Sequence, residues 1–315
     1  MLRLILLGLL AGLFFSSTFI LNRVMSLEGG HWVWSASLRY GYMILFLSAW
    51  FVVFKGPGHL VRVLQVFYKN WCFWTLAGSV GFGLFYALIC YSADHAPGWV
   101  VATTWQFTII ATLFVLLFFG RAFPAKTWFF SALVFSGVLM VNLGQAERTG
   151  LTVLVTGALP VLIAAFCYPL GNQMVWEASH GNRKLPDVRS PVLDTPFARV
   201  LLMSLGSLPL WLVLIAAAAP PPPSAGQLLN TALVALFSGV AATSLFLQAR
   251  NLSQTAGELA AVDATQSSEV VFALLGEIVI VGAAFPDILS VLGILTTCAG
   301  ITLFVCFQKP AEKKK

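Results

Sequence analysis

Four polar side chains recur on one face of an apolar stretch near the C-terminal end of the chain. They are Asp263, Gln266, Glu269 and Glu277, and at 100° per residue they fall within a stripe about 120° wide. An ionisable group among apolar neighbours is costly unless it has a partner or a water-filled cavity. The stripe is therefore expected to face the interior of the protein.

Two interpretations of these carboxyl groups stay open. In the first, Glu269 or Glu277 lines a cavity, where it exchanges protons or pairs with a cationic group of a bound molecule. In the second, both carboxylates neutralise structural arginines or form hydrogen bonds between helices. Asp263 lies nearer one end of its apolar stretch, where simple solvation is the alternative.

A second set of candidates lies within residues 98–120. Thr104, Trp105 and Gln106 could line the same cavity, with Trp105 stacking on an organic ligand. Packing against another helix explains Trp105 equally well. Tyr86, in the preceding apolar stretch, is a weaker candidate of the same kind.

Two arginines and two asparagines recur at related positions. Arg39 and Arg199 each lie early in an apolar stretch, and Asn22 corresponds to Asn172. The arginines could contact anionic groups or gate two openings. We favour an architectural role, in which each arginine snorkels or holds a carboxylate, because repeated residues are more easily explained by packing. The asparagines are expected to cap or cross-link helix ends, and contact with a ligand is the alternative.

The composition indicates which solvent surrounds these residues. Of 315 residues, 59% are hydrophobic and 10% are charged, whereas soluble domains carry about 25% charged residues. So few charges cannot cover a water-soluble globule of this size. Lipid must therefore contact most of the surface, and the chain is expected to be all-α and integral to a membrane.

Ten apolar windows are long enough to span a bilayer, each about 20 residues or more. They are 2–22, 32–54, 71–93, 98–120, 126–145, 151–176, 197–219, 229–249, 258–283 and 288–307, here called spans 1 to 10. Residues 56–70 place their polar side chains at helical spacing and are expected to lie along the membrane surface. The prolines 220–223 predict a stiff extended connector.

Lysine and arginine are distributed unevenly between alternate loops. One side holds only Arg23 and Arg148, and the other holds fourteen. These fourteen are Arg3, Lys55, Arg62, Lys69, Arg121, Lys126, Arg183, Lys184, Arg189, Arg250, Lys309, Lys313, Lys314 and Lys315. Because cationic loops stay in the cytoplasm, both termini are predicted to be cytoplasmic.

The chain also shows signs of an internal duplication. Phe123 and Pro124 correspond to Phe285 and Pro286, in the same order along each half as the arginine and asparagine pairs. Five spans per half would make the halves inverted copies, an arrangement that suits alternating access. We therefore predict a first repeat at 1–147, an inverted second repeat at 151–308 and a cytoplasmic basic tail at 309–315.

Several functional classes are not expected. The net charge of +6 forms no basic stripe, so nucleic acid is not an expected partner. The five cysteines are scattered without the spacing of a metal site, and no catalytic motif is present. We therefore expect no metal, no cofactor and no enzymatic activity.

The sequence resembles the drug/metabolite transporter superfamily of EamA-like proteins over nearly its whole length. The segments that carry the resemblance are FSSTFILNRVM, SLRYGYMILF, YSADHAPGWVVATTWQF and QARNLSQTAGELAAVDATQSSEVVFALLGE. Within the last, DATQSSEVVFALLGE is most similar to the multidrug-resistance efflux branch. The small four-helix multidrug exporters have an essential glutamate in their first span, but span 1 here has Ser16, Ser17 and Thr18 instead.

The resemblance implies a secondary transporter in a bacterial inner membrane, which exports a small organic metabolite or drug-like compound by alternating access. Proton coupling stays open, but not through a glutamate of span 1. The alternatives are an amino-acid or metabolite uptake permease and a membrane-embedded lipid-modifying enzyme. Expected partners are a small-molecule substrate, the lipid bilayer and protons, with the chain as a monomer or weak homodimer.

Overall fold

The chain forms ten membrane-spanning helical segments. The computed structural model describes residues 2–120, 125–182, 184–254 and 256–307, and these ranges contain helices and no strands. Ten helical segments within them are long and apolar enough to cross a membrane. This confirms the ten predicted spans, each to within a few residues of the expected boundaries.

The first five spans are arranged along the chain as follows. They are α1 (Leu2–Leu27), α2 (Trp32–Lys55), the series α4 (Trp71–Gly78), η1 (Ser79–Leu84) and α5 (Phe85–His95), the pair α6 (Gly98–Trp105) and α7 (Thr108–Phe118), and α8 (Ala125–Thr149). A separate helix, α3 (Pro57–Lys69), lies between spans 2 and 3. It occupies the segment predicted to lie along the membrane surface.

The second five spans follow the same order. They are η2 (Leu154–Ala158) with α9 (Leu159–Ser179), α10 (Pro196–Ala218), the series α11 (Ala225–Val234), η4 (Ala235–Ala242) and α12 (Thr243–Leu252), the series α13 (Ala256–Ala264), η5 (Thr265–Ser267), α14 (Ser268–Gly276) and η6 (Glu277–Val281), and α15 (Ile288–Phe307). A short 3₁₀ turn, η3 (Pro191–Asp194), precedes α10. Residues 219–224 are not helical, as the prolines predict.

Apolar side chains face outward along the spans. Phe118 and Val279, for example, are 82% and 81% exposed. In water such residues would be unfavourable, but hydrocarbon solvates them well, and helices satisfy their own backbone groups there. The outer surface is therefore suited to lipid contact.

Five spans depart from regular α-helix: span 6 begins with the π-helical stretch η2, and the other four form two matching pairs. Spans 3 and 8 each contain a π-helical stretch, η1 and η4. Span 4 tightens where Gln106 N–H and Phe107 N–H bond to carbonyls three residues back, at 3.1 and 3.0 Å. Span 9 has the 3₁₀ turn η5 at its equivalent point. Such interruptions are frequent at functional sites.

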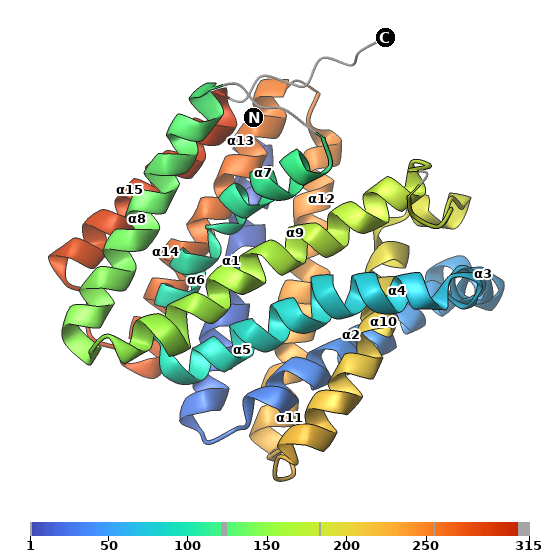
Figure 1. Cartoon of the computed structure of the whole chain (residues 1–315), viewed down its shortest axis with the longest axis horizontal. Helices are drawn as coiled ribbons and strands as arrows, with labels where there is room; N and C mark the ends of the chain where they lie inside the picture. Colours follow the sequence, from blue (N-terminus) through green and yellow to red (C-terminus); the bar gives the residue numbers. More distant parts are fainter. Residues whose placement is uncertain (1, 121–124, 183, 255, 308–315) are drawn as a thin grey trace.

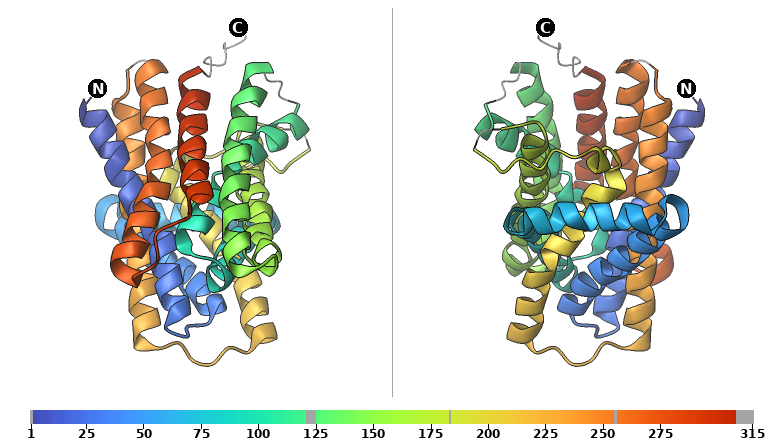
Figure 2. Two further views of the ribbon diagram at one scale, coloured as in Figure 1. Left: turned by 90° about the vertical axis from the view of Figure 1, so that its left-hand side faces the viewer. Right: turned by 90° about the vertical axis from the view of Figure 1, so that its right-hand side faces the viewer.

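The main contacts between the two halves of the chain follow one pattern, in which each contact has a counterpart when spans 1–5 are exchanged with spans 6–10. α2 packs against α10, and α8 packs closely along α15 (Figure 1; Figure 2). α1 contacts the span-8 and span-9 segments, while α9 contacts the span-3 and span-4 segments. This pattern is compatible with the predicted duplication. The landmarks Phe123 and Pro124 and the tail 309–315 lie outside the described residues.

The ends of the described chain lie on one side of the molecule. Figures 1 and 2 show the start of α1 and the end of α15 at the same side. Figure 1 views α3 almost along its axis, whereas α2 and α4 run across that view. The surface helix α3 therefore crosses the ends of these two spans instead of continuing them.

Candidate functional site: a cavity between the two halves

A cavity of about 260 Å³ lies among eight of the ten spans. Spans 5 and 10 do not contribute to its lining, since α8 and α15 pack against each other. The lining residues are Phe15, Thr18, Phe19, Arg39, Tyr40, Met43, Phe82, Phe85, Ile89, Trp105, Thr108, Tyr168, Val200, Ser238, Gly239, Thr243, Gln266 and Glu269. The wall thus joins apolar and aromatic side chains to one cation and one carboxyl group.

The interruptions of spans 4 and 9 meet beside this cavity. Gln106, at the tightened turn of span 4, donates a hydrogen bond of 2.7 Å from its amide to Oε1 of Glu269. Gln106 also donates to the carbonyl of Ala102 at 3.2 Å. Glu269 lies two residues after the turn η5, in the first turn of α14, and is 8% exposed. Gln266, within that turn, lines the cavity itself.

Arg39 provides a partly buried cation on another part of the wall. Its Nη2 donates to the hydroxyl of Ser238 at 3.0 Å, and its guanidinium lies 4.0 Å from the centre of the Tyr86 ring. Arg39 Nε is buried and has no hydrogen-bond partner in the described chain. No carboxylate among the described residues forms an ion pair with Arg39. A partly buried cation with a buried, unbonded Nε is unfavourable unless a ligand or water completes its contacts.

Aromatic rings form a third part of the wall. The centres of Phe85 and Trp105 are 4.9 Å apart, and those of Phe85 and Tyr168 are 5.0 Å apart. Tyr168 also meets Trp105 edge-on at 5.7 Å. Trp105 therefore both packs against neighbouring helices and lines the cavity, so the two interpretations of this residue coexist.

Glu277 lies away from the cavity lining. Its Oε2 accepts a hydrogen bond of 3.0 Å from the backbone N–H of Trp99, at the start of α6. Its Oε1 lies 3.9 Å from Nε of Arg23, which also donates to the carbonyl of Ala93. The carboxylate thus caps a helix N-terminus and meets an arginine of span 1, as in the second interpretation of the carboxyl stripe.

Asp263 and Arg199 are also placed outside the cavity lining. Asp263 forms an ion pair with Arg250 of α12. Arg199 donates from Nε to the carbonyl of Leu193 at 2.8 Å, which ties the start of α10 to the turn before it. The two arginines predicted to be counterparts therefore differ, because Arg39 lines the cavity and Arg199 does not.

The remaining predicted residues connect helices around the site. Asn22 donates to the hydroxyl of Tyr86 at 3.0 Å, which links span 1 to the ring beneath Arg39. Thr104 accepts a hydrogen bond of 2.8 Å from Asn142 of α8. Asn172 bonds within its own helix, to the carbonyl of Tyr168.

The sequence interpretation missed six polar wall residues, which are Thr18, Tyr40, Thr108, Tyr168, Ser238 and Thr243. Tyr168 lies in the middle of span 6, where an aromatic residue is too deep for an interfacial position, and that depth is the signal that could have identified it. Ser238 has no comparable signal, since serine is common at contacts between membrane helices. In the described part of the chain, no group of three His, Cys, Asp or Glu residues is placed to hold a metal ion.

Comparison with known protein families assigns the chain to one family. A family model named EmrE, described as "Putative multidrug resistance efflux transporter", matches residues 2–310. The chain belongs to this family. It is therefore a multi-pass membrane protein of a transporter family, as the resemblance implied.

Individual relatives agree with this assignment. The uncharacterized protein YjlA of Bacillus subtilis (strain 168) is 40% identical, over 99% of this chain and 97% of the relative. An uncharacterized 42.1 kDa protein of Shouchella clausii is 38% identical, over 78% of this chain and 64% of the relative. A crystal structure with 16% identity superposes with a TM-score of 0.58 and covers 96% of both chains. At that identity it supports the fold alone.

Proposed function

We propose that the protein is a secondary transporter that exports a small amphoteric organic molecule through the central cavity. One observation carries this proposal. A partly buried, unpaired cation and a buried carboxyl group line the same cavity between the two halves of a membrane-spanning helical protein. The family description, with its word efflux, favours export as the direction.

The wall supports a particular class of substrate. Arg39 offers donors to an anionic group such as a carboxylate, and Glu269 offers an acceptor to a cationic group. Between them, Trp105 and Tyr168 offer aromatic surface to an apolar body. The cavity volume of about 260 Å³ lies below the roughly 300–1,000 Å³ of typical pockets for drug-sized ligands. A metabolite of modest size therefore suits this conformation best.

Alternating access is the proposed mechanism. The interruptions of spans 4 and 9 meet beside the cavity, one from each half of the chain, and discontinuous helices of this kind surround the midplane sites of many transporters. Exchange of the conformations of the two halves would open the cavity to each side in turn. Glu269 can bind either a proton or the cationic group of the substrate, and this competition would couple transport to protons.

A thermal-shift measurement with three matched compounds tests the proposed substrate class. The purified chain is heated in detergent with phenylalanine, 3-phenylpropanoate or phenethylamine, which share a ring but carry both charges, the anion alone or the cation alone. A ligand that binds the folded state raises the midpoint of unfolding. We expect phenylalanine to raise it most, because it can contact Arg39 and Glu269 together.

Variants identify the residues responsible. Arg39→Gln should weaken binding of phenylalanine and 3-phenylpropanoate at least tenfold and leave phenethylamine unchanged. Arg199→Gln serves as the matched control, since Arg199 lies outside the cavity lining. Equal responses to the three compounds, or an Arg39→Gln variant that binds like the native chain, would refute the amphoteric class.

A further inference from the structure

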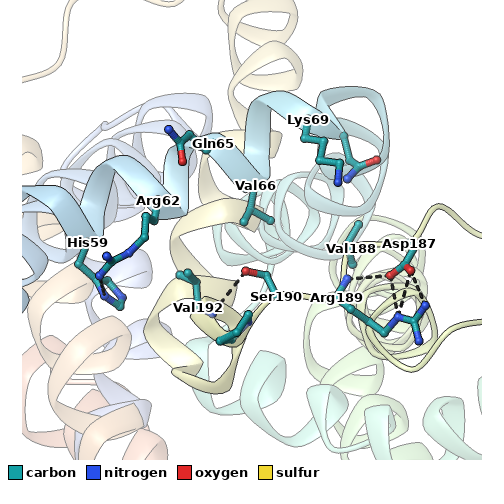
Figure 3. A pocket seen from close by; sticks show the side chains of 12 residues that line it. His59, Arg62, Gln65, Val66, Lys69, Asp187, Val188, Arg189, Ser190 and Val192 are labelled. Carbon is teal, nitrogen blue, oxygen red and sulfur yellow. Dashed lines mark hydrogen bonds and ion pairs between the residues drawn. The ribbon is translucent and has the colours of Figure 1, made fainter.

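A second hollow lies on the surface, away from the central cavity. It has a volume of about 490 Å³ and lies between the surface helix α3 and residues 187–192, which precede α10 (Figure 3). Its polar lining includes His59, Arg62 and Lys69 from α3, and Asp187 and Arg189 from the loop. We call this hollow the α3 groove.

The α3 groove carries an excess of positive charge. Asp187, the one carboxylate among the described lining residues, is engaged by Arg189, whose Nε donates to the two carboxylate oxygens at 2.9 and 3.0 Å. Hydrogen bonds from Arg189 lower the pKa of Asp187 to about 2, so this pair stays ionised at physiological pH. Arg62 and Lys69 form no ion pair with a carboxylate in the described chain. Two cations of the groove are thus left without an anion.

His59 adds an unused polar atom to the same wall. Its Nδ1 lies 3.3 Å from Nη2 of Arg62, and its ring stacks on Phe51 with 5.4 Å between ring centres. Its Nε2 is buried and has no hydrogen-bond partner among the described residues. His59 thus lines the groove next to the unpaired cation of Arg62, and its Nε2 has a hydrogen-bonding capacity that no described residue uses.

The faces of α3 show how the groove is oriented. Val63 is buried against the protein, while Val61 and Tyr68, seven residues apart and hence on one face, are 52% and 72% exposed. Arg62 and Lys69, also seven residues apart, lie about 100° further around the helix. A helix with adjacent exposed apolar and cationic faces suits the boundary between acyl chains and headgroups. In such a position the cations would lie at the level of the lipid phosphates.

We propose that the α3 groove binds a phosphate-bearing anion, supplied by the headgroup of an anionic phospholipid. Arg62 and Lys69 contact the phosphate oxygens, and the exposed face with Val61 and Tyr68 lies against the acyl chains. Arginine and lysine are the side chains that bind phosphate most strongly, and basic pockets at membrane level bind anionic headgroups. This site is independent of the transported substrate.

Binding of defined lipids to the full-length chain in detergent tests the proposal. The midpoint of thermal unfolding is followed as short-chain phosphatidylglycerol, short-chain phosphatidylcholine or inorganic phosphate is added. The test variant is Arg62→Gln/Lys69→Gln. The matched control is Lys55→Gln/Lys184→Gln, which removes the same charge from exposed lysines outside the groove.

The native chain and the control variant should bind phosphatidylglycerol at least tenfold more tightly than phosphatidylcholine. Each cation near an anionic headgroup contributes roughly fivefold, so the test variant should lose about 25-fold in affinity for phosphatidylglycerol. Inorganic phosphate could also stabilise the native chain but not the test variant. That result would support the site, but would identify a soluble anion as the source of the bound phosphate. The proposal would be overturned if the test and control variants bound phosphatidylglycerol and inorganic phosphate equally well. It would also be overturned if the native chain bound neither anion more tightly than phosphatidylcholine.

Discussion

Glu269 and Glu277 are both buried carboxyl groups of span 9, but their surroundings favour different roles. Glu269 lines the cavity, and its hydrogen-bond partner is the neutral amide of Gln106. Glu277 instead meets the first turn of α6 and the guanidinium of Arg23. A group with neutral partners can change its charge during a cycle, whereas a group paired with an arginine stabilises the fold.

The first prediction concerns coupling through Glu269. In Glu269→Gln, an imposed pH gradient should no longer drive transport, because the amide cannot carry a proton. Binding of 3-phenylpropanoate should stay within about threefold of the native value, since its carboxylate is proposed to contact Arg39. Transport into proteoliposomes with and without a pH gradient is the measurement. Gradient-driven transport at the native rate would remove Glu269 from this role.

The second prediction concerns the fold around Glu277. Replacement by Gln keeps an acceptor for Trp99 N–H but removes the charge that favours this bond and the contact with Arg23. The free energy of unfolding should fall by about 1–2 kcal/mol. Denaturation of the purified variant measures the loss. Transport per folded molecule should change less than twofold, and a complete loss of transport in a stable variant would contradict a purely structural role.

At this scale the sequence identified many of the residues but not their partners. Glu269 and Gln106 were both candidates, yet nothing in their spacing says that residues 163 positions apart share a hydrogen bond. Arg39 was interpreted as architectural because Arg199 has a matching position. The structure gives Arg199 a backbone partner and leaves Arg39 Nε without one. A repeated position therefore does not ensure a repeated environment.

At the scale of elements, the interrupted spans explain why helical periodicity does not predict which polar residues of span 9 line the cavity. The prediction of a polar stripe in span 9 assumes a regular helix with a rotation of 100° per residue throughout the span. The turn η5 changes that rotation after Asp263, and Glu277 lies eight residues beyond Glu269, more than two helical turns further along the span. Gln266 and Glu269 therefore line the cavity, while Asp263 and Glu277 pair elsewhere. Interruptions of this kind depend on packing between helices, which a single apolar pattern does not encode.

The third prediction concerns the crossing of spans 3 and 6. A Cβ on Gly171 would lie 2.4 Å from Cα of Gly81, a backbone atom that cannot move aside cheaply. Gly171→Ala should therefore force the helices apart and lower the free energy of unfolding by about 1–3 kcal/mol. Gly41→Ala is the matched control, because nothing lies within 4 Å of a Cβ there.

Denaturation of the two variants in detergent provides the comparison. Gly41→Ala should leave the free energy of unfolding unchanged or raise it by up to about 1 kcal/mol, since alanine favours helix. If Gly171→Ala were as stable as Gly41→Ala, the close approach of spans 3 and 6 would be wrong.

At the scale of the whole molecule, the ten spans were predictable because lipid restricts the choice of structure. A segment in hydrocarbon must satisfy its own backbone groups and needs about 20 apolar residues, so length and composition are sufficient evidence. The partners of each span were not predictable, because apolar side chains suit lipid and protein neighbours almost equally.

The fourth prediction concerns orientation in the membrane. The excess of Lys and Arg in alternate loops predicts that the loop with Lys184 is cytoplasmic and that with Pro222 is external. In a background without the five native cysteines, Pro222→Cys should react with a membrane-impermeant maleimide in intact cells. Lys184→Cys should react only after the membrane is opened. The reverse pattern would contradict the predicted orientation.

The central claim is that substrate passes through the cavity that contains Arg39, and counterflow into proteoliposomes tests it most directly. Vesicles that contain the purified chain are preloaded with unlabelled phenylalanine and diluted into labelled phenylalanine. The native chain and Arg199→Gln should accumulate label transiently above the equilibrium level, and Arg39→Gln should do so at least tenfold more slowly. Equal rates in the native chain and in Arg39→Gln would contradict the claim.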